Sequence, residues 1–153
     1  MTIFVKNKHT LQIDEFKFRC CIGKNGSTRK KNEGDKKTPK GTFKIENLYY
    51  RKDRKKKPLT QLRCIEIKKN LGWCDDIRFP KKYNKPVKIE KKIKHEKLRR
   101  KDNKYDFLIP IKYNFKAPII NLGSCIFIHL TKNYNPTAEC IALREKDFLI
   151  RLR

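Results

Sequence analysis

Acidic residues are scarce in this sequence. Asp and Glu total 16 against 41 Lys and Arg, so the formal net charge is +25. An excess of one sign informs about partners rather than about fold, because a positive field attracts nucleic acid, anionic membrane surfaces and acidic polymers alike. The charge does not choose between these three. An abundance of lysine at tolerant surface positions, with no dedicated partner, explains it equally well.

Long hydrophobic runs are absent. The longest uncharged apolar stretch, residues 117–130, contains Pro, Asn, Gly, Ser and His. It falls short of the roughly 20 apolar residues that a membrane helix needs. Residues 1–8 include two lysines and lack the apolar centre of a secretory signal. We therefore expect no membrane span and no secretory signal in this sequence.

The cysteine pattern lacks the spacing of a metal site. No CxxC pair occurs among the six cysteines, which stand at positions 20, 21, 64, 74, 125 and 140. A structural zinc site is therefore not predicted. An even number of cysteines is compatible with disulfides. Without a secretory signal, however, we expect mostly reduced, buried thiols that pack as small hydrophobic side chains.

Short segments rich in Ile, Phe and Tyr are present along the chain. Residues 64–68 read Cys-Ile-Glu-Ile-Lys, which is the alternation of a half-buried strand. Gly, Pro, Asn and Asp separate these segments, as in turns. Strands are predicted over residues 2–5, 16–22, 41–50, 63–68, 105–113 and 126–130. Length and pattern together predict one mainly β domain over residues 1–153, with few short helices and long charged loops.

Two helices are predicted. The first covers residues 88–100, which are mostly charged. The second covers residues 144–152, where Phe148, Leu149 and Leu152 lie close together at helical spacing. The densest charge runs, residues 51–57 and 81–104, are expected to be solvated loops or faces.

A histidine and a cysteine near the C-terminus have the residue types of an activated thiol. His129 lies near the end of a predicted strand, and Cys140 follows it by 11 positions, just before the predicted C-terminal helix. A neutral imidazole can take the thiol proton, and a helix N-terminus would further stabilise the thiolate. Alone, this pair is weak support for catalysis, because buried Cys and His commonly serve the core. Cys125 lies four positions before His129, so a strand would place both on the same side.

Four ordered blocks of the sequence form a recognisable pattern. The first has the GxxG, EGD and TPxGxF elements, over residues 23–26, 33–35 and 38–43. The second is Gly-Trp-Cys-Asp-Asp at residues 72–76, and the third runs from residue 95 to residue 114. The fourth extends from His129 to Cys140. Together these blocks resemble the L,D-transpeptidase catalytic domain family of the YkuD type, in its short single-domain members.

The last block also departs from that family's signature, which ends in Ser or Thr, His, Gly, Cys, a hydrophobic residue and then Arg or Asn. The matching residues are Thr137, Cys140 and Ile141. The departures are Ala138 for His, Glu139 for Gly and Ala142 for the final polar residue. A carboxylate beside a thiol raises the cost of forming the thiolate. We expect the Glu139 side chain to point harmlessly to solvent, with a direct effect on the thiol as the alternative.

The resemblance implies a mainly β fold, a YkuD-like β-sandwich or mixed sheet, and acyl transfer on peptidoglycan stem peptides. Cys140 would be the nucleophile that forms a thioester, and His129, oriented by a backbone carbonyl, would be the general base and then acid. Backbone N–H groups of Glu139, Cys140 and Ile141 would stabilise the oxyanion. The residues expected to contact substrate are Thr137, Ser124 and Tyr134. This chemistry needs no metal and no organic cofactor.

The resemblance also implies partners and a place. The partners would be stem peptides and anionic cell-wall polymer, in the periplasm or cell envelope, with the cytoplasm as the alternative because no signal is visible. L,D-carboxypeptidase activity is a further possibility. A catalytically inactive cell-wall-binding module of the same fold is an alternative, given the residues around Cys140. A nucleic-acid-binding protein is another, although the sequence has no helix-turn-helix, zinc-finger or RNP-like motif. The oligomeric state is left open.

Overall fold

Residues 3–150 are described by the computed structural model, and they form short strands joined by long loops, with one short helix. The strands are β1 (Ile3–Val5), β2 (Thr10–Ile13), β3 (Phe16–Arg19), β4 (Ser27–Thr28), β5 (Thr38–Pro39), β6 (Leu48–Tyr50), β7 (Cys64–Glu66), β8 (Leu71–Cys74), β9 (Pro86–Lys88), β10 (His95–Lys97), β11 (Phe107–Pro110), β12 (Phe127–Leu130) and β13 (Ile141–Leu143). The helix is α1 (Glu145–Ile150). The prediction of a mainly β fold is confirmed.

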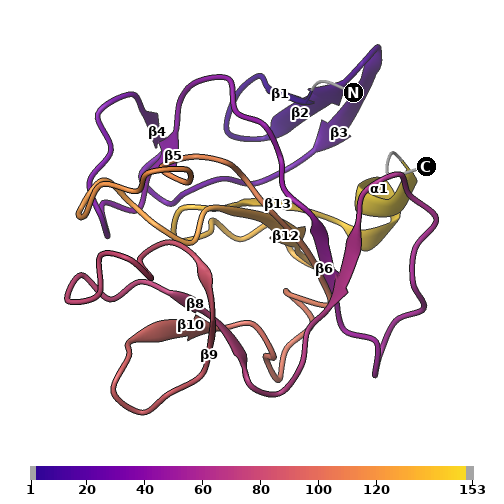
Figure 1. The fold of residues 1–153 in the computed structure, drawn as a ribbon. Coiled ribbons are helices and arrows are strands. Elements are labelled where there is room, and N and C mark those ends of the chain that lie inside the picture. The colour runs from indigo at the N-terminus through magenta and orange to yellow at the C-terminus, as the bar shows by residue number, and fades with distance from the viewer. Residues whose placement is uncertain (1–2, 151–153) are drawn as a thin grey trace.

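A five-stranded mixed sheet forms the centre of the molecule, in the order β13-β12-β11-β6-β7. β12 runs antiparallel to β11 and parallel to β13, so His129 lies opposite Leu108 on one side and Ala142 on the other. Figure 1 shows this sheet between two smaller antiparallel sheets, β1-β2-β3 and β10-β8-β9. β12 is thus an interior strand, and His129 lies near the middle of the fold.

The central sheet is buried on both faces. Successive side chains of a strand point to opposite faces of its sheet. In β12, Ile128 and Leu130 pack in one apolar cluster, whereas Phe127 packs in a second cluster that includes Cys140. His129 follows Phe127 by two residues and faces the same side. The strand period therefore brings His129 to the face on which Cys140 packs.

The second cluster is built around Trp73 of β8, which is 1% exposed. Its ring lies 5.2 Å from that of Phe127 and 6.0 Å from that of Tyr49, both edge to face. The indole N–H donates to Oδ1 of Asn84 at 2.9 Å, so this large side chain is buried without an unsatisfied donor. This packing joins the β8 sheet to the central sheet.

The six predicted strand segments each contain an observed strand, although most observed strands are shorter. The predicted segment 41–50 forms a strand only at its end, in β6, and Ile45 makes a single bridge to Ile111. Thr2 of the first predicted segment lies outside the described residues. The strands that the sequence reasoning missed are β2, β4, β5, β8, β9, β10 and β13.

The predicted helix over residues 88–100 is wrong. This segment contains the end of β9 and the whole of β10, where His95, Glu96 and Lys97 pair antiparallel with β8. Ile93 and Leu98, which flank β10, are buried. Packing of these two side chains beside the paired strand outweighs the helix propensity of the charged residues around them.

The predicted C-terminal helix is present as α1, and Phe148 stacks on Phe107 with ring centroids 6.0 Å apart. Leu152 lies outside the described residues. Cys140 does not directly precede this helix, because β13 comes between them. The expected stabilisation of a thiolate by a helix N-terminus is therefore wrong. Within residues 3–150, no helix has the length and apolar character needed to cross a membrane.

The charge run over residues 51–57 is not simply a solvated loop, which corrects that prediction. Arg51 is buried, and three basic side chains of the run form ion pairs, one within the run and two with other parts of the chain. Their ion pairs are Arg51–Asp53 at 2.7 Å, Arg54–Asp106 at 3.1 Å and Lys55–Glu145 at 2.6 Å. Part of the positive charge therefore holds the fold together instead of facing solvent.

Candidate active site

β12 carries His129, whose imidazole is buried. Nδ1 lies 2.9 Å from the carbonyl oxygen of Leu130, and the Tyr105 ring packs against the imidazole at 5.3 Å. An N–H at Nδ1 donated to this carbonyl leaves Nε2 as the proton acceptor of the ring. The predicted orientation of the imidazole by a backbone carbonyl is confirmed by this contact.

Cys140 lies immediately before β13 and is 7% exposed. Its thiol donates to the carbonyl oxygen of Cys125 at 3.3 Å, and its sulfur accepts the backbone N–H of Phe127 at 3.4 Å. These two contacts place the sulfur at the start of the strand that carries His129. The N–H of Phe127 is also a donor that would remain useful when the sulfur becomes a thiolate.

Cys125 does not occupy the strand position that the sequence reasoning gave it. It precedes β12, and its backbone has a φ of 55°, so strand alternation does not relate it to His129. Its sulfur lies 4.0 Å from the carbonyl oxygen of Trp73. Cys125 therefore contacts Cys140 through its backbone carbonyl, while its own thiol contacts β8.

Burial sets the protonation of both candidate catalytic groups. It raises the pKa of the Cys140 thiol to about 12, an effect that the Phe127 N–H opposes and the Glu96 carboxylate reinforces. Burial also lowers the pKa of the His129 imidazole to about 4, against the effect of the Leu130 carbonyl. At neutral pH the pair is therefore a thiol and a neutral imidazole, not a preformed ion pair.

Glu139 does not point to solvent, which corrects the sequence-based expectation. The residue is 8% exposed, and Oε2 lies 2.9 Å from Nζ of Lys31. Its carbonyl oxygen accepts the hydroxyl of Thr38 at 2.8 Å. One residue further on, the Cys140 carbonyl accepts the hydroxyl of Thr137 at 2.5 Å. The segment around the nucleophile is thus held through both side chains and main chain.

The three backbone N–H groups predicted as oxyanion donors differ in their availability. Within the described part of the chain, no acceptor takes the N–H of Glu139 or of Cys140. Ile141, in contrast, belongs to β13 and lies in the ladder opposite Ile128. The first two N–H groups therefore have no acceptor within residues 3–150, and of the two residues Cys140 lines the cavity.

His129 and Cys140 line a common cavity of about 660 Å³. Ala142, opposite His129 in the ladder, also lines it, and its small side chain leaves space beside the imidazole. The charged residues of the wall are Arg100, Lys104, Lys132, Arg144 and Lys146 on the basic side and Glu96, Asp102 and Glu145 on the acidic side. The cavity therefore presents more positive than negative groups to a ligand.

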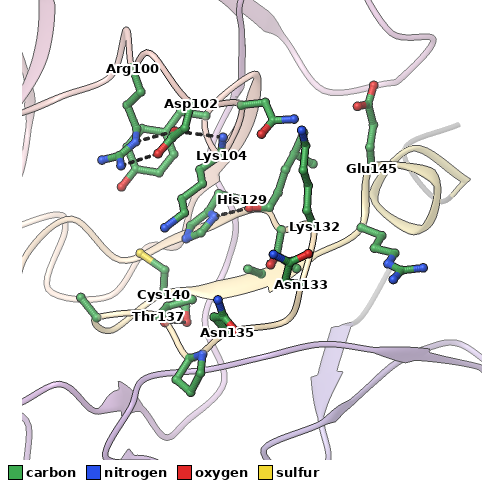
Figure 2. A pocket seen from close by; sticks show the side chains of 18 of the residues that line it. Arg100, Asp102, Lys104, His129, Lys132, Asn133, Asn135, Thr137, Cys140 and Glu145 are labelled. Atoms are coloured by element: carbon green, nitrogen blue, oxygen red, sulfur yellow. Dashed lines mark hydrogen bonds and ion pairs between the residues drawn. The ribbon is translucent and has the colours of Figure 1, made fainter.

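Lys104 reaches toward His129 and Cys140, the candidate catalytic pair. Figure 2 shows its side chain, the His129 imidazole and the Cys140 sulfur pointing into the same space. Two hydrogen bonds of the Lys104 main chain fix the loop that carries it: its N–H donates to Oδ1 of the Asp102 carboxylate at 3.2 Å, and its carbonyl accepts the N–H of Leu130 at 2.9 Å. Between residues 3 and 150, no carboxylate pairs with its ammonium, which leaves the charge available to a ligand.

The three residues predicted to contact substrate have different surroundings. Thr137 lines the cavity. Ser124 is buried and donates its hydroxyl to Glu33 at 2.9 Å. The Tyr134 ring lies between the guanidinium groups of Arg19 and Arg144, at 4.4 and 5.2 Å. Neither Ser124 nor Tyr134 is among the described residues that line the cavity, so a substrate contact for these two stays a prediction.

The six cysteines are free thiols, and the buried ones are Cys20, Cys21, Cys74 and Cys140. Across residues 3–150, no three His, Cys, Asp or Glu side chains are grouped so that they could hold a metal ion.

The family model of YkuD, the L,D-transpeptidase catalytic domain, matches residues 1–149. The chain belongs to the L,D-transpeptidase catalytic domain family. The match includes both His129 and Cys140, together with the whole central sheet. Among the curated proteins and the solved structures there is no significant match to this chain.

Two residues near Cys140 in this L,D-transpeptidase domain were not predicted from the sequence. Thr38 belongs to the TPxGxF element of the first sequence block. Its hydroxyl accepts the N–H of Gly23 at 2.9 Å and donates to the Glu139 carbonyl. It therefore connects β5 to the segment that directly precedes Cys140. Lys31 is one of 41 basic residues and has no local signal. The motif could have pointed to Thr38, whereas nothing in the sequence pointed to Lys31.

Proposed function

We propose that this chain is a cysteine-nucleophile acyltransferase that acts on peptidoglycan stem peptides, as an L,D-transpeptidase. The observation that carries the proposal is the meeting of Cys140 and His129 at one cavity, in a chain of this family. The family also favours a location in the cell envelope. His129 as base and Cys140 as nucleophile account for the chemistry without a metal or cofactor.

The first half-reaction forms a thioester. As the Cys140 sulfur attacks the carbonyl carbon of the L-centred residue in an L,D amide, its proton passes to Nε2 of His129. The tetrahedral oxyanion then collapses, the C–N bond breaks, and the imidazolium gives its proton to the departing D-residue amine. Because both groups are neutral at rest, the proton transfer accompanies the attack instead of preceding it.

The second half-reaction releases the acyl group. An amine of a neighbouring stem attacks the thioester and loses a proton to His129, and the thiolate leaves and is reprotonated by the imidazolium. Water in place of the amine gives L,D-carboxypeptidase activity. In both halves, the free N–H groups of Glu139 and Cys140 are the donors best placed to stabilise the oxyanion, ahead of Ile141 in its ladder.

A substrate carboxylate has a partner at the cavity. The donor stem ends in a D-residue with a free carboxylate. The Lys104 ammonium lies beside the reacting groups, and no carboxylate of the described residues pairs with it. An ion pair between them would orient the scissile amide over Cys140. Ala142 leaves open the space in which the substrate would approach His129.

Incubation of the protein with a stem tetrapeptide and an acceptor stem is the test. We expect release of the terminal D-residue and formation of a cross-linked dimer, measured by mass spectrometry. The tetrapeptide C-terminal amide is expected to react on the order of tenfold more slowly in kcat/KM, because it offers Lys104 no carboxylate. A shortened peptide without dimer would identify a carboxypeptidase. If neither the shortened peptide nor the dimer forms, the proposal is contradicted.

The basic surface supports binding to anionic cell-wall polymer. Lys and Arg outnumber Asp and Glu by 25, and attraction by many exposed lysines requires no specific geometry. Binding to purified cell wall, measured by co-sedimentation, is expected to weaken steeply between about 0.01 and 1 M salt, as the Debye length falls from roughly 30 to 3 Å. Binding that ignores salt would count against this part of the proposal.

A further inference from the structure

Lys31 is a buried lysine in a chain whose other described lysines are at least partly exposed. Its side chain has no exposed surface. Its ammonium lies 2.7 Å from Oδ1 of Asp35, 2.7 Å from the carbonyl oxygen of Asn32 and 2.9 Å from Oε2 of Glu139. Each of its three N–H donors therefore has an acceptor, which is the condition under which a charge can be buried at moderate cost.

The fold makes room for this lysine at Gly123. The glycine has a φ of +101°, and a Cβ built there would lie 3.1 and 3.2 Å from carbons of the Lys31 side chain and 3.4 Å from its nitrogen. Any other residue would be strained in this conformation and would press on the lysine. The segment before β12 is thus shaped around the Lys31 side chain.

Glu139 is held at two points. Lys31 binds its carboxylate, and the Thr38 hydroxyl binds its carbonyl oxygen at 2.8 Å. In a trans peptide the carbonyl and the following N–H point in opposite directions, and no cis peptide bond occurs among the described residues. The N–H of Cys140 therefore points away from Thr38. The two contacts fix the peptide unit between Glu139 and Cys140.

The same ion pair governs the charge next to the thiol. A carboxylate one residue from a nucleophilic cysteine opposes the thiolate, whereas an ammonium bonded to that carboxylate cancels most of its field. The other titratable groups that face Cys140 are Glu96, Tyr105, Cys125, His129 and Lys104. Those that face the ion pair itself are Asp35, Glu33 and Tyr113. Apart from Lys31, none of the groups that face the ion pair carries positive charge.

We propose that Lys31 is a positioning residue for the nucleophile: its ammonium holds and neutralises the Glu139 carboxylate, so the Cys140 thiolate forms beside an ion pair instead of a free negative charge. The role of Lys31 in catalysis rests on the proposed function, whereas its effect on the ionisation of the Cys140 thiol does not. Where the family signature has glycine, this chain combines a glutamate with a compensating lysine.

The rate of carbamidomethylation of Cys140 by iodoacetamide, followed by peptide mass spectrometry across a pH series, tests this. We expect Lys31→Met to slow modification at neutral pH by about tenfold, which corresponds to a one-unit upward shift of the profile. Glu139→Gln should accelerate it by about three- to tenfold, and the double variant should return to within about threefold of wild type. Lys30→Met, which removes an exposed charge from the neighbouring position, should leave the rate of Cys140 modification and its pH profile unchanged.

Each outcome decides the matter. A folded Lys31→Met protein with the wild-type pH profile would overturn the proposal, as would a double variant as slow as Lys31→Met. If Lys31→Met does not fold, Glu139→Gln decides, since it keeps the Lys31–Asp35 pair: a profile moved to lower pH supports the proposal, and an unchanged one refutes it. Iodoacetamide needs no peptide substrate, so absent transpeptidation would refute the proposed function without touching this result.

Discussion

Replacing Cys140 with alanine is expected to abolish peptide turnover and covalent labelling by a thiol-reactive carbapenem, because only this thiolate can form the thioester. The loss of turnover should be at least about 1000-fold. The variant should fold, because it loses one small buried group and the contact with the Phe127 N–H, at a cost of about 1–2 kcal/mol. Thermal unfolding followed by circular dichroism checks the fold, and intact-mass spectrometry checks the labelling.

Cys125→Ala is the matched control. Its backbone carbonyl, which accepts the Cys140 thiol, is retained in the variant, while its own thiol is removed. We expect labelling and turnover to persist. Loss of labelling in folded Cys125→Ala but not in Cys140→Ala would refute the nucleophile assignment and leave the family assignment standing. A wild-type protein that is never labelled would instead support the inactive cell-wall-binding module, with the high thiol pKa as its physical cause.

His129→Ala should fold and lose about 10²- to 10⁴-fold in kcat/KM, because the buried thiol then lacks its proton acceptor. The pH profile separates this role from a structural one. In the wild type, kcat/KM is expected to fall as the pH drops through about 4, where the imidazole becomes protonated and can no longer accept the thiol proton. In His129→Ala that acid limb should vanish, and activity should rise with pH as hydroxide generates the thiolate directly.

His9→Ala serves as the control for this variant, because His9 is exposed and is not among the described residues that line the cavity. Its profile should match the wild type. A His129→Ala protein that keeps both its rate and its acid limb would show that another group accepts the proton. Stopped-flow or discontinuous assays at a series of buffered pH values provide the measurement.

The strand that carries His129 was predictable because its sequence pattern is local. The strand period over residues 126–130 fixes which side chains share a face. Ile128 and Leu130 lie on one face and Phe127 lies on the face of His129, so both faces must be buried. The helix predicted over residues 88–100 is wrong for the opposite reason. There the charged sequence has little preference of its own, and pairing of β10 with β8 decides the conformation.

Glu139 is the clearest case of a residue whose environment the sequence could not give. Charged residues in a loop are usually exposed, so solvent was the reasonable expectation. Its partner Lys31 lies far away in the chain, in a loop that only the completed fold brings beside the nucleophile. The same holds for Lys104, whose approach to the cavity depends on the packing of its loop against Leu130.

The sequence by itself indicated the mainly β character, the family and the candidate pair of His129 and Cys140, because strand periodicity and motif order are properties of neighbouring residues. Tertiary structure alone decided the neutral state of that pair, the ion pair behind the nucleophile and the basic cavity wall. Burial and Coulomb interactions depend on which distant segments come within a few ångströms of one another, and that proximity exists only once the sheets have packed.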